Sequence, residues 1–191
     1  MRIVDPATGT SYFKKCRRRI NAAGHARELT FSCYRRFSFF SRERTCEWFR
    51  EANEVARKKF TFGIWAYVLM PDHVHLLVYP GDRAAAAQVP RFLQAVKEPV
   101  ARQAIEYLKA NAPQWLARLT VQEGQRVRHR FWQPGGGYDR NITSARTLRA
   151  MIEYIHATPV RRGLVARTED WEWSPVKIEM DAEVLDVVAR G

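Results

Sequence analysis

Two strand-like runs meet at a short turn in one stretch of the chain, Tyr67-Val68-Leu69-Met70-Pro71-Asp72-His73-Val74-His75-Leu76-Leu77-Val78. Met70-Pro71-Asp72 is typical of a turn and the flanking apolar residues favour strands, so the pattern predicts a hairpin. Successive side chains of a strand point to opposite faces, so His73 and His75 share one face. Two of the five histidines of the chain are therefore expected side by side.

This histidine pair is suited to hold a metal ion. A rigid strand spaces two imidazoles for a divalent cation and leaves the other coordination positions to substrate oxygens or water, which suits Lewis-acid catalysis. The alternative is that both side chains are half-buried sheet residues that bond to backbone groups. The stretch by itself does not decide between these two interpretations.

Length and composition favour one folded domain. The chain has 191 residues, of which 46% are hydrophobic and 12% aromatic, enough for one buried core. Its three cysteines, Cys16, Cys33 and Cys46, have no paired spacing and indicate reduced thiols. No apolar run approaches the ~20 residues of a membrane span, and the amino terminus lacks the apolar core of a signal peptide. We expect a soluble cytoplasmic protein with no membrane partner.

Basic residues are concentrated in two regions of the chain. Lys and Arg number 32 against 20 Asp and Glu, so the formal net charge is +12. Residues 1–60 hold 15 basic and 6 acidic side chains, and residues 126–167 hold 9 and 2. Such a distribution is what a phosphate-binding surface requires, and it indicates a nucleic acid as the partner. An anionic membrane is the weaker alternative, because the sequence lacks a strongly amphipathic basic helix flanked by bulky anchors.

The periodicity of the chain predicts strands that alternate with helices. The first four elements are expected as a strand with its turn over residues 28–40, a helix over 42–58, a second strand over 60–69 and the histidine strand. A long helix is expected over 84–110, kinked or interrupted by Pro99. Residues 111–125 have no clear assignment, and a short strand is expected over 128–132.

A last helix is expected after the glycine turn at residues 134–137. Residues 138–141 lead toward it, and Thr143 or Ser144 is its N-cap. Its buried side is an apolar stripe that comprises Leu148, Met151, Ile152 and Ile155.

These elements together predict an α+β sandwich, in which helices cover a small antiparallel sheet. We divide the chain into a basic arm over residues 1–26, a domain over 27–178 and an acidic tail over 179–191.

Tyr154 lies on the last helix beside the apolar stripe, and Thr158 follows it one turn later. Arg161 and Arg162 come soon after and are suited to clamp a phosphate. A phenolic oxygen that attacks a metal-polarised phosphate would form a covalent phosphotyrosine and conserve the bond energy for rejoining. The alternative is an amphipathic tyrosine at the edge of the core. Tyr138 is a competing nucleophile, but no helix supports it.

Other histidines and tryptophans have simpler interpretations. His156 is expected to point away from Tyr154 and to bond at the surface or to backbone groups. His129 lies in a basic strand, where contact with phosphate is favoured over metal binding. The remaining candidates for stacking on bases are expected to pack in the core instead, and they are Trp132, Trp171 and Trp173.

Several blocks of this sequence resemble one family. Met70 to Val78 is similar to the His-hydrophobic-His motif of single-tyrosine (HUH) transposases. Further blocks, in the same order as in the family, resemble its REP-associated branch: Phe131-Trp132-Gln133-Pro134 with Tyr138-Asp139-Arg140-Asn141, then Tyr154 to Val165, then Trp171-Glu172-Trp173-Ser174. The resemblance extends over most of the chain, roughly from Glu28 to Pro175.

The resemblance implies a ferredoxin-like, or RRM-like, domain that binds single-stranded DNA with a hairpin or palindromic repeat, as a monomer or homodimer. It also implies a transposase that uses Mg²⁺ or Mn²⁺ and cuts and rejoins this DNA through a 5′-phosphotyrosine. By motif, His73, His75 and Thr158 become metal ligands and Tyr154 becomes the nucleophile. Thr158 departs from the family's usual asparagine, and its hydroxyl is a shorter and weaker ligand than an amide oxygen.

Basic side chains in the arm and around these blocks are the expected DNA contacts: Arg17, Arg18, Arg35, Arg36, Arg128, Arg130, Arg140, Arg161 and Arg162. Two other interpretations come from different classes of protein. A metallohydrolase barrel would need ~250 residues and further ligands, which the chain does not offer. A sequence-specific DNA-binding protein of the same fold with weakened catalysis needs only the basic surface, and Thr158 is compatible with it.

Overall fold

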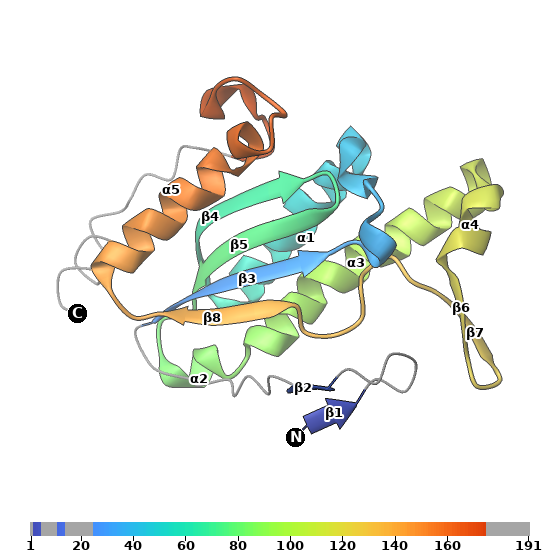
Figure 1. The fold of residues 1–191 in the computed structure, drawn as a ribbon, viewed down its shortest axis with the longest axis horizontal. Coiled ribbons are helices and arrows are strands. Elements are labelled where there is room, and N and C mark those ends of the chain that lie inside the picture. The colour runs from blue at the N-terminus through green and yellow to red at the C-terminus, as the bar shows by residue number, and fades with distance from the viewer. Residues whose placement is uncertain (1, 5–10, 14–24, 175–191) are drawn as a thin grey trace.

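The computed structural model describes residues 2–4, 11–13 and 25–174. At its centre lies an antiparallel sheet of four strands in the order β4-β5-β3-β8 (Figure 1). These strands are β3 (Ala26–Ser32), β4 (Gly63–Met70), β5 (His73–Tyr79) and β8 (Tyr138–Ile142). The predicted hairpin is confirmed, because β4 and β5 pair antiparallel across the turn at Pro71 and Asp72.

Most of the predicted basic arm, including Arg17 and Arg18, lies outside the described residues, as does the predicted acidic tail. Within the arm, β1 (Arg2–Val4) and β2 (Ser11–Phe13) pair with each other.

Helices cover both faces of the sheet. Helices α1 (Glu43–Phe60) and α3 (Val89–Asn111) pack against each other on one face, and α5 (Ala145–Arg161) lies against the other (Figure 1). In chain order, the strands and the first two long helices read β3-α1-β4-β5-α3-β8, which is the ferredoxin-like arrangement. The predicted α+β sandwich is confirmed. None of the described helices is long and apolar enough to span a bilayer.

Shorter elements complete the domain. They are the 3₁₀ helices η1 (Tyr34–Arg36), η2 (Phe39–Ser41) and η3 (Thr168–Asp170), the helices α2 (Arg83–Ala86) and α4 (Pro113–Leu119), and the strands β6 (Thr120–Glu123) and β7 (Arg126–His129). Strands β6 and β7 form a hairpin that projects away from the main sheet (Figure 1).

Two apolar cores lie on opposite faces of the sheet. The larger core lies under α1 and α3 and includes Phe49, Leu76 and Phe92. The smaller core lies under α5, where Val68 and Leu77 of the sheet meet Ile155 of the helix. Alternation along the strands produces this division, because adjacent residues of a strand point to opposite faces.

One prediction was wrong, because residues 138–142 form the edge strand β8 and do not simply lead into the last helix. The segment is short and polar, so it lacks the apolar alternation by which strands are found in a sequence. A buried ion pair attaches it to β3: Nη2 of Arg27 lies 2.7 Å from both carboxylate oxygens of Asp139.

Other boundaries differ from the predictions by a few residues. The helix expected over 84–110 is divided into α2 and α3, and α3 continues through Pro99. The unassigned residues 111–125 contain α4 and β6, and the strand expected over 128–132 runs from Arg126 to His129. Ser144 is the N-cap of α5, since its Oγ accepts a hydrogen bond from the backbone N–H of Thr147.

Replacing Asp139 with alanine should destabilise the fold, because it removes a carboxylate that pairs with the buried guanidinium of Arg27. We expect a loss of about 3 kcal/mol in the free energy of unfolding, measured by urea denaturation. The matched control is Glu54→Ala, which removes a carboxylate from exposed ion pairs with Arg57 and Lys58 and should cost less than about 1 kcal/mol. Equal losses in the two variants would contradict the role of the buried pair.

Candidate active site

The two histidines of β5 lie on the face of the sheet that α5 covers. Their cross-strand neighbours on β4 are Met70 and Val68, which belong to the core under α5. The ring centroids of His73 and His75 are 4.9 Å apart, and the rings are nearly perpendicular. Both side chains are buried, with 5% and 8% of their surface exposed. The sheet thus holds the pair side by side, as the sequence predicts.

Neighbouring side chains fix the orientation of both rings. The Nδ1 atom of His73 lies 2.6 Å from Oδ1 of Asp72, and the Nδ1 atom of His75 lies 2.9 Å from Oγ1 of Thr30. The Nε2 atom of neither ring has a hydrogen-bond partner among the described residues. This is the arrangement of a metal-binding histidine, in which one ring nitrogen is held by an acceptor and the other binds the ion.

Burial keeps both imidazoles neutral at physiological pH. Desolvation, repulsion from a protonated His73 and the positive charges of Arg162 and Arg36 together lower the pKa of His75 from 6.5 to about 4. Desolvation also lowers the pKa of His73, although its hydrogen bond to Asp72 acts in the opposite direction. The neutral form is the one that binds a metal ion.

Tyr154 reaches the histidine pair from α5. Its ring centroid lies 5.7 Å from that of His75, and the two rings meet edge to face. The guanidinium of Arg161 lies 4.7 Å from the centre of the tyrosine ring. Tyr154 is 38% exposed, so a ligand can reach it from solvent. The structure therefore brings the candidate nucleophile to the candidate metal site.

Thr158 is buried one turn beyond Tyr154. Its hydroxyl donates a hydrogen bond of 2.7 Å to the backbone carbonyl of Tyr154. This bond uses the hydroxyl proton and leaves lone-pair density on the oxygen. The role of Thr158 as a metal ligand stays a prediction.

Three of the predicted DNA-contacting arginines surround this site. The positive charges of Arg36 and Arg162 lower the pKa of both His73 and His75, which shows that they lie near the pair. Nε of Arg36 also forms an ion pair of 2.9 Å with Asp72, the partner of His73. Arg161 completes the group through its contact with Tyr154.

The backbone beside the site has an unusual conformation. Arg35 and Arg36 have φ angles of 52° and 58°, in the left-handed region that non-glycine residues seldom adopt. The backbone N–H of Arg35 donates to Oε1 of Gln133, and Nη1 of Arg36 donates to Oγ of Ser32. Backbone strain of this kind is concentrated at functional sites.

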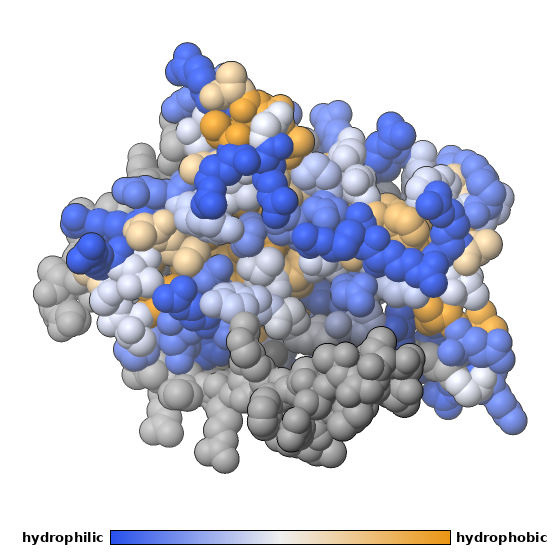
Figure 2. Space-filling model, in the orientation of Figure 1, coloured by the Kyte–Doolittle hydropathy of each residue, from blue (hydrophilic) through white to orange (hydrophobic). Residues whose placement is uncertain are grey.

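The other predicted DNA contacts lie elsewhere. Arg128 is on β7 and Arg130 follows it, so both belong to the projecting hairpin. Arg140 lies on β8 opposite Glu28, where its charge counteracts the rise in the pKa of that carboxyl caused by burial. Figure 2 shows that hydrophilic residues dominate the visible face of the domain.

Two residues of the site were missed by sequence reasoning. Asp72 directly precedes His73, so its position in the turn was an available signal. Thr30 could not be found, because only the register of β3 against β5 brings it opposite His75.

The prediction for His156 was wrong in one respect. Its side chain is buried, and Nδ1 lies 2.8 Å from Oγ of Ser174, so it bonds neither at the surface nor to the backbone. Trp132 and Trp171 pack against the cores and donate from Nε1 to the carbonyls of Lys97 and Leu69.

The residues present fit a divalent cation. Two buried, neutral imidazoles lie side by side with ring centroids 4.9 Å apart, and their Nδ1 atoms already have partners. No group of three or more His, Cys, Asp or Glu suited to a metal occurs within the described part of the chain. The remaining coordination positions therefore fall to hydroxyl, water or substrate oxygens.

Comparisons with known proteins find relatives in sequence and in structure. A Haemophilus influenzae protein provisionally named a REP-associated tyrosine transposase is 23% identical over 138 residues, which cover 71% of each chain. A solved structure of a REP-associated tyrosine transposase bound to a REP hairpin has a TM-score of 0.62 at 20% identity, over 85% of this chain and 83% of that one. The resemblance to REP-associated tyrosine transposases is confirmed.

Two further findings complete the comparison. The crystal structure of a protein from Deinococcus radiodurans, provisionally named a transposase, has a TM-score of 0.43 at 19% identity, over 74% of this chain and 93% of that one. No family model matches the chain. The four-stranded antiparallel sheet with helices packed on it is the fold of the REP-associated tyrosine transposase structure.

The depressed pKa of His75 should make the metal-free protein less stable in acid. Unfolded His75 takes up a proton below about pH 6.5, whereas the folded side chain resists protonation down to about pH 4. Its stabilising contribution is complete above the unfolded pKa and is lost as the pH falls toward the folded pKa. Between neutral pH and about pH 4.5, the wild type should lose roughly 2 kcal/mol more than His75→Gln, measured by urea denaturation with chelator present.

His129→Gln, on the projecting hairpin, controls for the loss of a histidine as such. If the wild type and His75→Gln lose the same free energy of unfolding in acid, a buried neutral imidazole at this position is contradicted.

Proposed function

We propose that this chain is a transposase that cuts and rejoins single-stranded DNA bearing a hairpin or palindromic repeat, with Tyr154 as the nucleophile. The observation that carries the proposal is the edge-to-face contact of Tyr154 with His75, whose ring centroids are 5.7 Å apart. The ring centroid of His73 lies 4.9 Å from that of His75. A surface phenol, two imidazoles and several arginines are the groups that phosphodiester cleavage through a covalent intermediate requires. The similarity to a protein that is bound to a REP hairpin supports the choice of substrate.

Arginines position the phosphate in this proposal. Arg36 and Arg162 lie near the histidine pair, and Arg161 contacts the ring of Tyr154. Their guanidinium groups offer paired donors to the non-bridging oxygens of a phosphate. The phosphorus is thereby held close to the phenolic oxygen. The guanidinium groups also stabilise the negative charge that develops on the phosphate oxygens in the transition state.

His73 and His75 would hold Mg²⁺ or Mn²⁺ through their Nε2 atoms, and Thr158 would contribute an oxygen from α5. Such an ion, when bound, polarises a phosphoryl oxygen. Asp72 and Thr30 orient the two imidazoles through Nδ1, so the ligand atoms are preorganised before DNA arrives.

The proposed step exchanges one phosphodiester bond for another. The phenolic oxygen of Tyr154 forms a bond with phosphorus as its proton passes to water, and the bond from phosphorus to the 3′ oxygen breaks. That oxygen takes up a proton and leaves as a 3′ hydroxyl, while the 5′ phosphate stays on the tyrosine. Because the new bond conserves the energy of the old one, a second 3′ hydroxyl can reverse the step and rejoin the strand.

A DNA-binding protein of the same fold with weakened catalysis is the second candidate. The hydrogen bond from Thr158 to the carbonyl of Tyr154 favours it, because this hydroxyl already has a partner within the helix. Covalent attachment to DNA separates the two candidates, since binding alone produces no adduct.

Tyr154→Phe should abolish covalent attachment and leave DNA affinity within about twofold, because only the nucleophilic oxygen is lost. The measurement incubates the protein with a labelled DNA hairpin that carries single-stranded flanks, adds Mn²⁺, and detects the adduct after denaturation. Tyr138→Phe is the matched control and should retain the adduct. Loss of the adduct in Tyr138→Phe but not in Tyr154→Phe would assign the nucleophile to Tyr138.

If the wild type binds the DNA but forms no covalent adduct with Mn²⁺ present, the candidate that only binds DNA is correct.

A further inference from the structure

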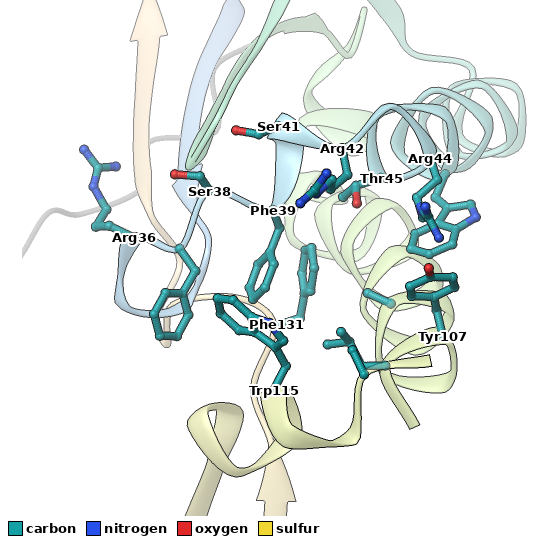
Figure 3. A pocket seen from close by; sticks show the side chains of 15 residues that line it. Arg36, Ser38, Phe39, Ser41, Arg42, Arg44, Thr45, Tyr107, Trp115 and Phe131 are labelled. Atoms are coloured by element: carbon teal, nitrogen blue, oxygen red, sulfur yellow. The ribbon is translucent and has the colours of Figure 1, made fainter. Parts of the chain in front are cut away.

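A cavity of about 920 Å³ opens next to the turns that follow β3 (Figure 3). Its walls come from η1 and η2, from the start of α1, from the end of α3 and from α4. Arg36 borders this cavity and also forms the ion pair with Asp72, the partner of His73. One residue thus connects the cavity to the histidine pair.

Aromatic rings form much of the cavity wall. Figure 3 shows Phe39, Trp115 and Phe131 grouped around the same space. Phe37 meets Trp115 edge to face at 5.7 Å, and Phe39 stacks on Phe131 at 4.7 Å. Phe37, Phe39 and Trp115 are only partly buried, so part of each ring is open to a ligand at the cavity.

Arginine side chains lie against two aromatic rings of the cavity wall, Trp115 and Tyr107. The guanidinium of Arg118 lies 4.2 Å from the centre of the Trp115 ring, and that of Arg44 lies 4.1 Å from the centre of the Tyr107 ring. Arg42 is exposed, and Figure 3 shows its guanidinium directed across the cavity. None of the residues that line the cavity is acidic. The site therefore combines stacking surfaces with positive charge.

Hydroxyl groups supply a third kind of contact. Ser38 and Ser41 line the cavity and are exposed, so each can donate to or accept from the edge of a ligand. Packing of α4 against the core explains contacts between the rings, but it does not explain why serines and arginines surround an open space. A planar, anionic ligand with hydrogen-bonding edges fits all three features.

We propose that this aromatic cavity binds an unpaired nucleobase of the DNA strand that is cut at Tyr154. This proposal rests on the proposed function and names a part of its substrate. The base stacks on Trp115 and meets the perpendicular ring of Phe37 edge to face, and its phosphate lies toward Arg42. Stacking on aromatic side chains is how proteins hold single-stranded nucleic acid, and cationic side chains beside the rings strengthen it.

Arg36 lies at both the cavity and the histidine pair. Because its guanidinium bonds Asp72 beside the histidines while its chain borders the cavity, a strand that follows Arg36 passes from one site to the other. The cavity would then hold the strand in register and present a defined phosphate to Tyr154. Binding energy gained at a remote base is thus used for positioning.

The test measures the affinity for two labelled DNAs in the presence of chelator: a hairpin with a blunt end and the same hairpin with a short unpaired thymidine extension. Trp115→Ala and Arg42→Ala should each weaken binding of the extended hairpin about tenfold and leave binding of the blunt hairpin within about twofold. Arg102→Ala, an exposed arginine of α3 outside the cavity, is the matched control and should change neither affinity.

A second readout places 2-aminopurine in the extension. Its fluorescence should be quenched on binding to the wild type and to Arg102→Ala, but not to Trp115→Ala. Because Arg42 is a surface residue, its variant tests the cavity even if Trp115→Ala does not fold. Equal effects on the two DNAs, or no effect on either, would overturn the cavity proposal while DNA binding by the wild type still supports the proposed function. If the wild type binds neither DNA, the proposed function itself fails.

Discussion

The register of β5 between β3 and β4 is the constraint on which the candidate site depends. This register sets His75 opposite Thr30 and places both histidines on the face that α5 covers. A slip of one residue would turn both imidazoles into the larger apolar core and move Val74 and Leu76 to the face that α5 covers. The unfavourable burial of polar rings among Phe49 and Phe92 opposes such a slip, so the same pattern that folds the sheet also builds the site.

Helix α5 supplies the second half of the site through ordinary packing. Its apolar residues Leu148 and Ile155 join the core under the helix, and this packing brings Tyr154 against His75. The helix therefore needs no special contact to position the phenol. Arg161 ends the helix and Arg162 is its C-cap, so one segment carries the candidate nucleophile and two of the predicted phosphate-binding charges.

Local patterns predicted much of the fold, and non-local pairing accounts for what they missed. The hairpin of β4 and β5, the shared face of the histidines and the N-cap at Ser144 depend on residues close in the sequence. Strand β8 depends on pairing with β3 and on the buried contact of Arg27 with Asp139, more than a hundred residues apart. The partner of His75 and the aromatic cavity were missed for the same reason, since the cavity lining runs from Arg36 to Phe131.

The central claim is that Asp72 and Thr30 turn two neutral imidazoles toward one divalent cation beside Tyr154. Anomalous diffraction from crystals soaked in Mn²⁺ tests it most directly, because the signal locates the ion independently of activity. The account predicts one manganese peak within coordination distance of the Nε2 atoms of both His73 and His75, on the side of Tyr154. No peak at this pair, or a peak held by other side chains, would contradict it.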